Sequence, residues 1–255
     1  MTNQPTHAMQ LRNESIFSHV ITDFWQSSFQ SSRILYADDL FTIAIDPDLS
    51  EDRRVVVLET VDGKVKAVLT PAMAAKAELT PQPELTAAIF RKKLSEAGIM
   101  LHGADYLFYF TEEDKRILEQ EIVEADLRQL TAQDDAVFSA FQSAASEQDL
   151  DDAYVELDHW AVFGSFDQQH LVCAASMYPW EQSKFADIGV LTLAAHRGKG
   201  HARNVVRSIS RYAYKQGYVP QYRCQLDNYA STSLAKAAGL TLFGKWEVIS
   251  PVSTN

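Results

Sequence analysis

Hydrophobic and polar positions in the first half of the chain follow short strand and helix periods. The run RVVVLETVDGKVKAVLT holds two β-rich segments joined at Asp62-Gly63, a dipeptide suited to the positive φ angles of a tight hairpin. Apolar spacing predicts helices over 15–28 and 85–97, and 106–110 predicts a buried strand. This half carries no phosphate-loop, metal-ligand or nucleophile motif. It therefore serves either as a scaffold or as part of a substrate pocket.

In the second half the predicted elements alternate more regularly. Thr131, followed by Asp134 three residues later, predicts a capped helix after a short strand. The acidic segment 146–152 predicts a surface connection. β-rich runs predict further strands over 159–166, 170–177, 186–194, 219–226 and 242–249.

Charge is distributed unevenly along the 255 residues. The composition is that of a globular protein of one or two domains, with 23 basic and 34 acidic side chains and a net charge of −11. This balance argues against general nucleic-acid binding, which depends on phosphate contacts. Residues 1–158 carry −16 (13 basic, 29 acidic), whereas residues 159–255 carry +5 (10 basic, 5 acidic). The basic part either serves a small anionic ligand or is a solvated surface of different charge.

The two cysteines, Cys173 and Cys224, have no CxxC or Cys/His pairing around them. We therefore expect reduced thiols, and we predict neither a disulfide framework nor a metal site. No apolar run approaches the roughly 18 to 20 residues that cross a bilayer, and the start MTNQPTHAMQLRNES lacks the regions of a signal peptide. These features predict a cytoplasmic protein that does not bind membranes.

The segment 187–203, DIGVLTLAAHRGKGHAR, runs from a strand through a glycine-containing turn into a helix. Gly198 and Gly200 let backbone amides approach a ligand without side-chain obstruction. The first amides of a helix have no internal partner and lie at the positive end of the macrodipole, so this turn can cradle phosphates. Arg197 and Lys199 add positive charge.

Basic residues recur at every fourth position of the following helix, at Arg203, Arg207, Arg211 and Lys215. Either they form a solvated stripe, or the first one or two contact a ligand phosphate. The apolar residues of this helix recur at three- and four-residue steps, which predicts one face packed against a sheet.

Two common phosphate-loop templates do not fit the turn. A nucleoside triphosphate loop needs GxxxxGK followed by Ser or Thr, and a dinucleotide fingerprint needs a third Gly where Arg203 stands. The stretch Arg-Gly-Lys-Gly-His-Ala instead resembles the (Gln/Arg)xxGx(Gly/Ala) signature of the GNAT N-acyltransferase superfamily. Arg197, Gly200 and Ala202 occupy the signature positions.

The sequence downstream extends this resemblance. The segment 228–240, NYASTSLAKAAGL, is similar to the superfamily's next strand-to-helix unit, in which an Asn precedes a helix that closes at Gly and a hydrophobic residue. The resemblance implies an α/β mixed fold with a central, largely antiparallel sheet flanked by helices. The whole chain also resembles the two-part bacterial members of the superfamily. This implies an acyl-CoA-binding catalytic domain over 123–255 and an N-terminal α/β domain over 1–122, which is either unrelated or a degenerate GNAT-like unit.

The resemblance implies acetyl-CoA or another acyl-CoA as cofactor, attacked directly by a primary amine of a small molecule or an amino-acid-like acceptor. It implies pyrophosphate on the turn, the pantetheine arm on the preceding strand, and Asn228 at the cofactor or the splayed strand, although Asn228 can also be only a helix cap. The implied cofactor-binding residues are Val190, Leu191, Thr192, Arg197, Gly198, Lys199, Gly200, His201, Ala202, Arg203, Asn228 and Ser231.

The acid and base are set less firmly by the resemblance. Many relatives carry a Tyr seven residues after the Asn, but this chain has Ala235 there. The catalytic candidates are therefore Asp187 as base and Tyr229 or Ser233 as acid, with water as an alternative donor. Rival bases are Glu181, Glu156, His159 and Glu247, whereas His196 and His201 are expected to be exposed or to neighbour the phosphates.

The leading prediction is a CoA-dependent N-acetyltransferase, a monomer or a homodimer whose partner is a small-molecule amine. The alternative is a non-catalytic CoA-binding or regulatory module, and the absence of a Tyr at position 235 favours it. A nucleotide enzyme is a third reading, and the absent phosphate-loop residues count against it.

Overall fold

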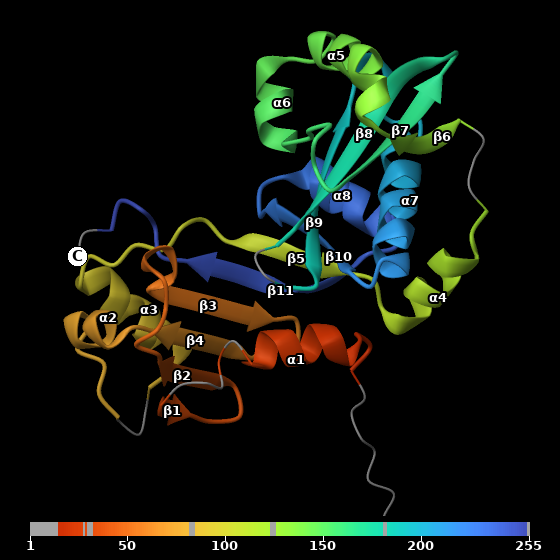
Figure 1. Ribbon diagram of the computed structural model, residues 1–255. Helices are drawn as coiled ribbons and strands as arrows, with labels where there is room; N and C mark the ends of the chain where they lie inside the picture. The colour runs from red at the N-terminus through yellow and green to blue at the C-terminus, as the bar shows by residue number, and fades with distance from the viewer. Residues whose placement is uncertain are drawn as a thin grey trace, which may run out of the picture.

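The structure is a computed structural model that describes residues 15–253 except 28, 30–32, 82–84, 123–125 and 181–182. The described strands form one 11-stranded sheet in the order β1-β2-β4-β3-β11-β5-β10-β9-β8-β7-β6 (Figure 1). Only β2–β4 and β9–β10 are parallel among the described neighbours. This mixed, largely antiparallel sheet flanked by helices confirms the predicted fold class.

Within the described residues, the first half contributes five strands and four α-helices. The strands are β1 (Arg33–Ala37), β2 (Phe41–Ile45), β3 (Val55–Thr60), β4 (Val65–Leu69) and β5 (Asp105–Tyr109). The helices are α1 (His19–Ser27), α2 (Pro71–Lys76), α3 (Ala87–Glu96) and α4 (Glu112–Gln120). β3 and β4 form the predicted antiparallel hairpin, and Gly63 in its turn has a φ of 82°. The predicted helix over 15–28 corresponds to α1, with Ser28 outside the described residues.

The described part of the second half contains six strands and four α-helices. The strands are β6 (Leu127–Leu130), β7 (Ala161–Asp167), β8 (His170–Pro179), β9 (Phe185–Thr192), β10 (Val219–Gln225) and β11 (Thr241–Val248). The helices are α5 (Asp135–Ser143), α6 (Glu147–Ala153), α7 (His201–Lys215) and α8 (Tyr229–Ala237), with 3-10 turns η2 (Ala132–Asp134) and η3 (Ala194–His196). The predicted capping box of Thr131 and Asp134 is present at η2, immediately before α5.

Helices cover both faces of the sheet because successive strand residues point to opposite sides. In β3, Val55 and Val57 pack in the core that includes residues of α2 and α3, whereas Val56 and Leu58 pack in the core that includes Trp25 of α1. In the other part of the sheet, α7 and α8 share a core with Ile188 of β9, and α5 shares another with Leu191.

The acidic segment 146–152 is a helix, which corrects the predicted surface connection. Ser146 is the N-cap of α6, and its hydroxyl oxygen accepts a hydrogen bond from the Asp149 amide at 3.1 Å. Tyr154 ends the helix in a left-handed conformation. The capping side chain and the acidic first turn stabilise this short helix although it lacks an apolar stripe.

The basic stripe of α7 is not a solvated face throughout. Arg207 and Arg211 are buried, and both guanidinium groups donate hydrogen bonds to Glu121, just after α4. Arg207 Nε lies 2.9 and 2.8 Å from the two carboxylate oxygens of Glu121, and Arg207 Nη1 also donates to the Ala238 carbonyl. These contacts join α4, α7 and the end of α8.

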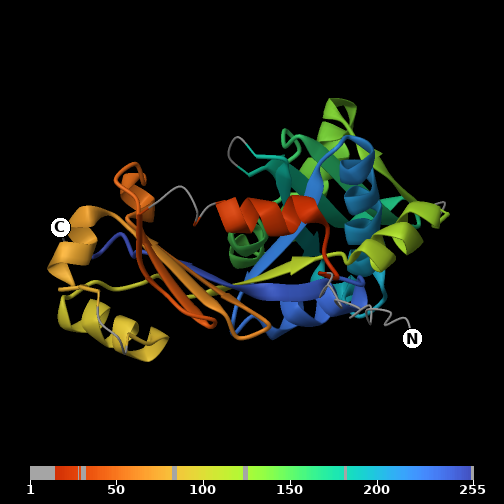
Figure 2. The same cartoon turned by 90° about the horizontal axis from the view of Figure 1, so that it is seen from below.

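One sheet joins the two halves of the chain. β5 from the first half lies between β10 and β11, and β11 lies between β3 and β5. The predicted boundary between 122 and 123 falls between α4 and β6, and the division into two domains stays a prediction. Seen from below, the orange strands and helices α2 and α3 lie at one end of the molecule and the α5–α7 part at the other (Figure 2). Among the described helices, none combines the length and the apolar character that a bilayer crossing requires.

Arg207, which is buried and paired with Glu121, should contribute more to stability than the exposed basic residue Lys215 of the same helix. We expect Arg207→Ala to lower the free energy of unfolding by about 2 kcal/mol, because it leaves the Ala238 carbonyl and the partly exposed Glu121 carboxylate without the Arg207 donor. Urea denaturation followed by circular dichroism measures this change. Lys215→Ala, at the exposed end of the same stripe, is the control and should change stability by less than about 1 kcal/mol. Equal losses in the two variants would contradict the structural role of Arg207.

Candidate active site

The glycine turn between β9 and α7 presents main-chain amides at a helix N-terminus. Gly198 and Gly200 have φ angles of 77° and 89°, a region that L side chains rarely adopt, and Gly200 is the N-cap of α7. The first helical hydrogen bond runs from the Asn204 amide to the Gly200 carbonyl at 3.1 Å. The amides of His201, Ala202 and Arg203 precede it and are therefore oriented outward at the positive end of the helix dipole.

The guanidinium groups beside this turn are engaged by other parts of the protein. Arg197 donates to Asp149 of α6 at 2.7 Å and to the Thr192 carbonyl at 3.2 Å. Arg203 donates to the Ala237 carbonyl at 3.1 Å. Lys199 is exposed. The turn therefore offers an anion mainly its backbone amides, with the basic side chains arranged around them.

β9 and β10 pair only over their first three residues and then diverge. The parallel register joins 185–187 to 219–221, after which β10 pairs with β5 while β9 continues beside β8 as far as Thr192. The edge of β9 from Ile188 to Thr192 is thus not paired with β10. A cleft of about 440 Å³ opens at this divergence.

Residues of both strands and of the neighbouring helices line the cleft. They are Asp105, Asp151, Asp152, Ala153, Ile188, Gly189, Val190, Tyr222, Arg223, Cys224, Gln225, Asn228 and Ser231. Gly189 is required here because a Cβ would lie 2.3 Å from the Ala153 carbonyl oxygen at the end of α6. Both cysteines are buried and free, as predicted, and Cys224 is one of the lining residues.

Asn228 lies at the cleft and caps α8. Its side-chain oxygen accepts a hydrogen bond from the Ser231 amide at 2.9 Å, so the capping role weighed in the sequence analysis is present. Val190 and Ser231 also line the cleft. The predicted cofactor residues Val190, Asn228 and Ser231 are therefore gathered at one opening.

Asp187 is the last residue of β9 that pairs with β10, and its carboxylate is 4% exposed. It accepts hydrogen bonds from Gln221 Nε2 at 2.7 Å and from Arg223 Nη2 at 2.7 Å. Arg223 also lies 3.4 Å from Asp105. Both oxygens of Asp187 accept hydrogen bonds from residues of β10, so this side chain links β10 to β9. Its role as base stays a prediction.

The two predicted acid candidates lie on α8. Tyr229 is 78% exposed, and the Ser233 hydroxyl donates to the Tyr229 carbonyl at 2.7 Å, within the helix. Neither side chain lines the cleft. The predicted proton-donor roles remain predictions.

Tyr222 is a cleft residue that the sequence analysis did not single out. Burial raises the pKa of its phenol to about 12, so the group keeps its proton at neutral pH. It belongs to the same core as Ala235, the position at which the resemblance implies a tyrosine. Tyr222 can be recognised as a site candidate only in the folded chain, where it lies in the same core as α8. In the sequence it is an ordinary residue of an apolar strand.

The rival bases lie in different surroundings. His159 is half-buried with its Nδ1 2.8 Å from the Ser176 hydroxyl, and burial lowers the pKa of this imidazole. Glu247 forms an ion pair with Arg91, and Glu156 accepts from Gln142 at 3.4 Å. Glu181 lies outside the described residues.

The family model for GNAT acetyltransferases matches residues 82–249. A GNAT-family acetyltransferase from Colwellia psychrerythraea has 18% identity, with 74% of this chain and 78% of that one covered and a TM-score of 0.50. A GNAT-family protein from Novosphingobium aromaticivorans has 15% identity, coverage of 72% and 82%, and a TM-score of 0.44. No curated protein matches the sequence.

The matched region begins well before residue 123, where the resemblance implies that the catalytic domain starts. It includes β5, the strand that the first half places between β10 and β11. It also includes the glycine turn, the diverging strands and both helices at the cleft. Because the family model matches more than half of the chain, the chain belongs to the GNAT acetyltransferase family and is an acyltransferase.

Proposed function

We propose that this acyltransferase moves the acetyl group of acetyl-CoA, or a related acyl group, to a primary amine of a small molecule. The divergence of β9 and β10 beside the glycine turn carries the proposal, because it joins an unpaired strand edge to a set of outward amides. Both features fit a long ligand that has a diphosphate at one end and an amide-containing arm at the other.

The turn would hold the diphosphate. Outward amides of His201, Ala202 and Arg203 can donate to phosphate oxygens, and no atom of the described chain lies within 4 Å of a Cβ built on Gly198 or Gly200. The edge of β9 at Val190, Leu191 and Thr192 offers main-chain groups to the arm. Asn228 and Ser231 border the opposite side of the cleft.

The thioester, when bound, supplies an activated acyl carbonyl and a thiolate leaving group. The chain's own contribution is to orient the amine, remove its proton and protonate the thiolate. Three carboxylates line the cleft, Asp105, Asp151 and Asp152, and their charge favours an acceptor that arrives as an ammonium ion. Burial raises the pKa of Asp105, which lies beside Arg223.

In this proposal the Tyr222 hydroxyl donates a proton to the departing thiolate. Tyr222 is one of the residues that line the cleft, and its hydroxyl keeps its proton because burial raises its pKa to about 12. Asp187 is proposed to fix the point at which the strands separate, because it holds Gln221 and Arg223 there, in addition to its predicted role as base.

A thiol-release assay tests the function directly. We expect the full-length protein to bind acetyl-CoA in calorimetric titration and to release free CoA when a panel of primary diamines and amino acids is added. Mass spectrometry should find one acetyl group on the amine. The form of an active amine in which every primary nitrogen is dimethylated is the matched control and should give no stable product. Binding without thiol release from any amine would favour the non-catalytic module, and no binding at millimolar acetyl-CoA would overturn the proposal.

The turn itself is tested by Gly200→Glu. A carboxylate in the open space at the helix N-terminus should weaken acetyl-CoA binding by at least about 100-fold, because it occupies the place of the phosphates and repels them. Gly217→Glu is the matched control, since Gly217 has a φ of 78° and a Cβ there meets no described atom within 4 Å. Each variant should lose about 1 kcal/mol of stability through backbone strain, but only the first should lose binding in calorimetry. Equal affinities in the two variants would mean that the turn holds no phosphate.

Tyr222→Phe tests the proposed proton donor. The ring remains and only the hydroxyl is lost, so we expect kcat to fall by about 100-fold while the KM for acetyl-CoA changes little. Tyr229→Phe, which alters the exposed hydroxyl, should leave kcat near that of the unaltered protein. The reverse pattern would assign the donor to Tyr229. Because the pKa of Tyr222 is raised to about 12, its ionisation should not lower the rate between pH 7 and about 10.

A further inference from the structure

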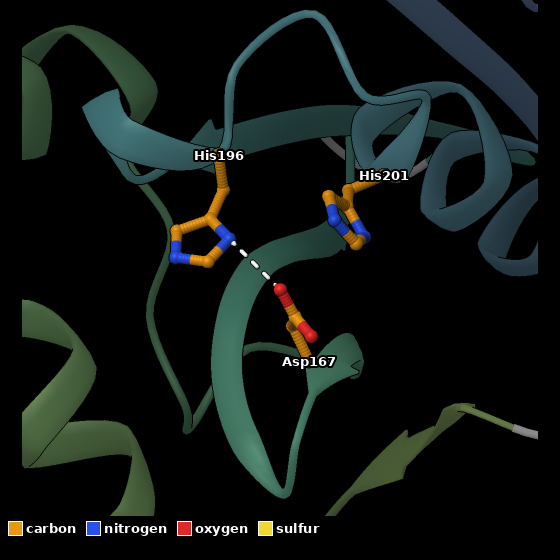
Figure 3. Close-up of side chains that lie close together, drawn as sticks. All are labelled: Asp167, His196 and His201. Carbon is orange, nitrogen blue, oxygen red and sulfur yellow. Dashed lines mark ion pairs between the residues drawn. The ribbon is translucent and has the colours of Figure 1, made fainter.

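Two histidines and an aspartate converge on the side of the glycine turn that faces the β7–β8 hairpin. Asp167 ends β7, His196 ends η3, and His201 begins α7 (Figure 3). One ligand atom of each residue lies within 4.8 Å of the ligand atoms of the other two. Segments far apart in the sequence therefore place two imidazoles and one carboxylate around a common point.

The contacts within this cluster leave a nitrogen unsatisfied. His196 Nδ1 lies 3.5 Å from the Asp167 carboxylate, which is too long for a hydrogen bond. This nitrogen is buried and has no hydrogen-bond partner among the described residues. A buried polar atom without a partner is uncommon and calls for an explanation such as an ion.

The other imidazole is held by a neighbour on the same strand as Asp167. His201 Nδ1 lies 2.9 Å from the Ser165 hydroxyl, which fixes the orientation of the ring and leaves Nε2 unengaged by that contact. Histidines that ligate metals are commonly held through their second nitrogen in this way. Of the cations nearby in the sequence, Arg197 is paired with Asp149, and Lys199 is exposed.

We propose that Asp167, His196 and His201 bind one divalent transition-metal ion of the zinc type. Two imidazole nitrogens and a carboxylate oxygen are ligands that zinc accepts, with bonds of about 2.0 to 2.2 Å and a fourth position open to solvent. Tetrahedral bonds of that length separate the ligand atoms by roughly 3.3 Å, so the three side chains must close slightly. Asp167, whose side chain is 42% exposed at the end of the hairpin, has room to do so. Magnesium and calcium prefer all-oxygen sites and fit this set poorly.

The ion ties the β7–β8 hairpin to the beginning of α7. The bound ion stabilises the glycine turn, which lies between His196 and His201, and gives His196 Nδ1 a partner. Metal binding here needs no acyl-CoA, so the site stands or falls separately from the proposed function.

Calorimetric titration of the metal-free full chain with zinc chloride tests the site. We expect one equivalent to bind at neutral pH, and magnesium chloride to give no binding. His196→Ala, His201→Ala and Asp167→Asn should each weaken zinc binding by at least about 10-fold. His170→Ala is the matched control, because His170 is an exposed histidine on the same hairpin and is not in the cluster. It should bind zinc with unchanged affinity.

Circular dichroism checks that each variant is folded, and Asp167→Asn, the most conservative change, keeps the test decisive if a histidine variant unfolds. A crystal structure with anomalous scattering at the zinc edge should show the ion bonded to the three side chains. No zinc binding, or binding that the three ligand variants leave unchanged, would overturn the proposal. An equal loss in His170→Ala would indicate adventitious surface binding and would overturn it as well.

Discussion

The architecture around the site depends on the point at which β9 and β10 stop pairing. Gln221 and Asp187 are register partners there, and their side chains are joined by a hydrogen bond of 2.7 Å. Arg223 binds the same carboxylate, and Gln221 accepts from Tyr109, which in turn accepts from Trp25 at 2.9 Å. A fully satisfied buried network of this kind is rigid, and it fixes where the strands separate. The cleft opens where the pairing of β9 and β10 ends, at Asp187 and Gln221, whose side chains are held by this network.

This network also explains why the two halves of the chain share one sheet. Trp25 belongs to α1 and Tyr109 to β5, so the first half supplies the outer members of the network. β5 also brings Asp105 to the cleft, beside Arg223. The first half therefore contributes a residue to the cleft as well as strands to the sheet, and the family match begins at residue 82, before β5.

Local signals predicted the elements whose cause lies within a few residues. The Asp62-Gly63 hairpin, the Thr131 capping box and the glycine turn before α7 each depend on backbone conformation or on adjacent donors. Helix α6 was missed because its stability comes from its cap and acidic first turn rather than from an apolar stripe. The burial of Arg207 was missed because its partner, Glu121, lies far away in the sequence, and spacing along one helix cannot reveal it.

The same distinction separates the two parts of the site. Main-chain amides at a helix N-terminus follow from the local sequence, whereas the side chains around the cleft come together only through the sheet. Ala235 shows this most clearly, because it is buried in the same core as Tyr222. Tyr222, a cleft residue on β10, carries the phenol that we propose as proton donor, and it lies on a different element from the one that the resemblance implies. The signature turn is therefore recognisable from the local sequence, whereas the set of side chains that line the cleft is not.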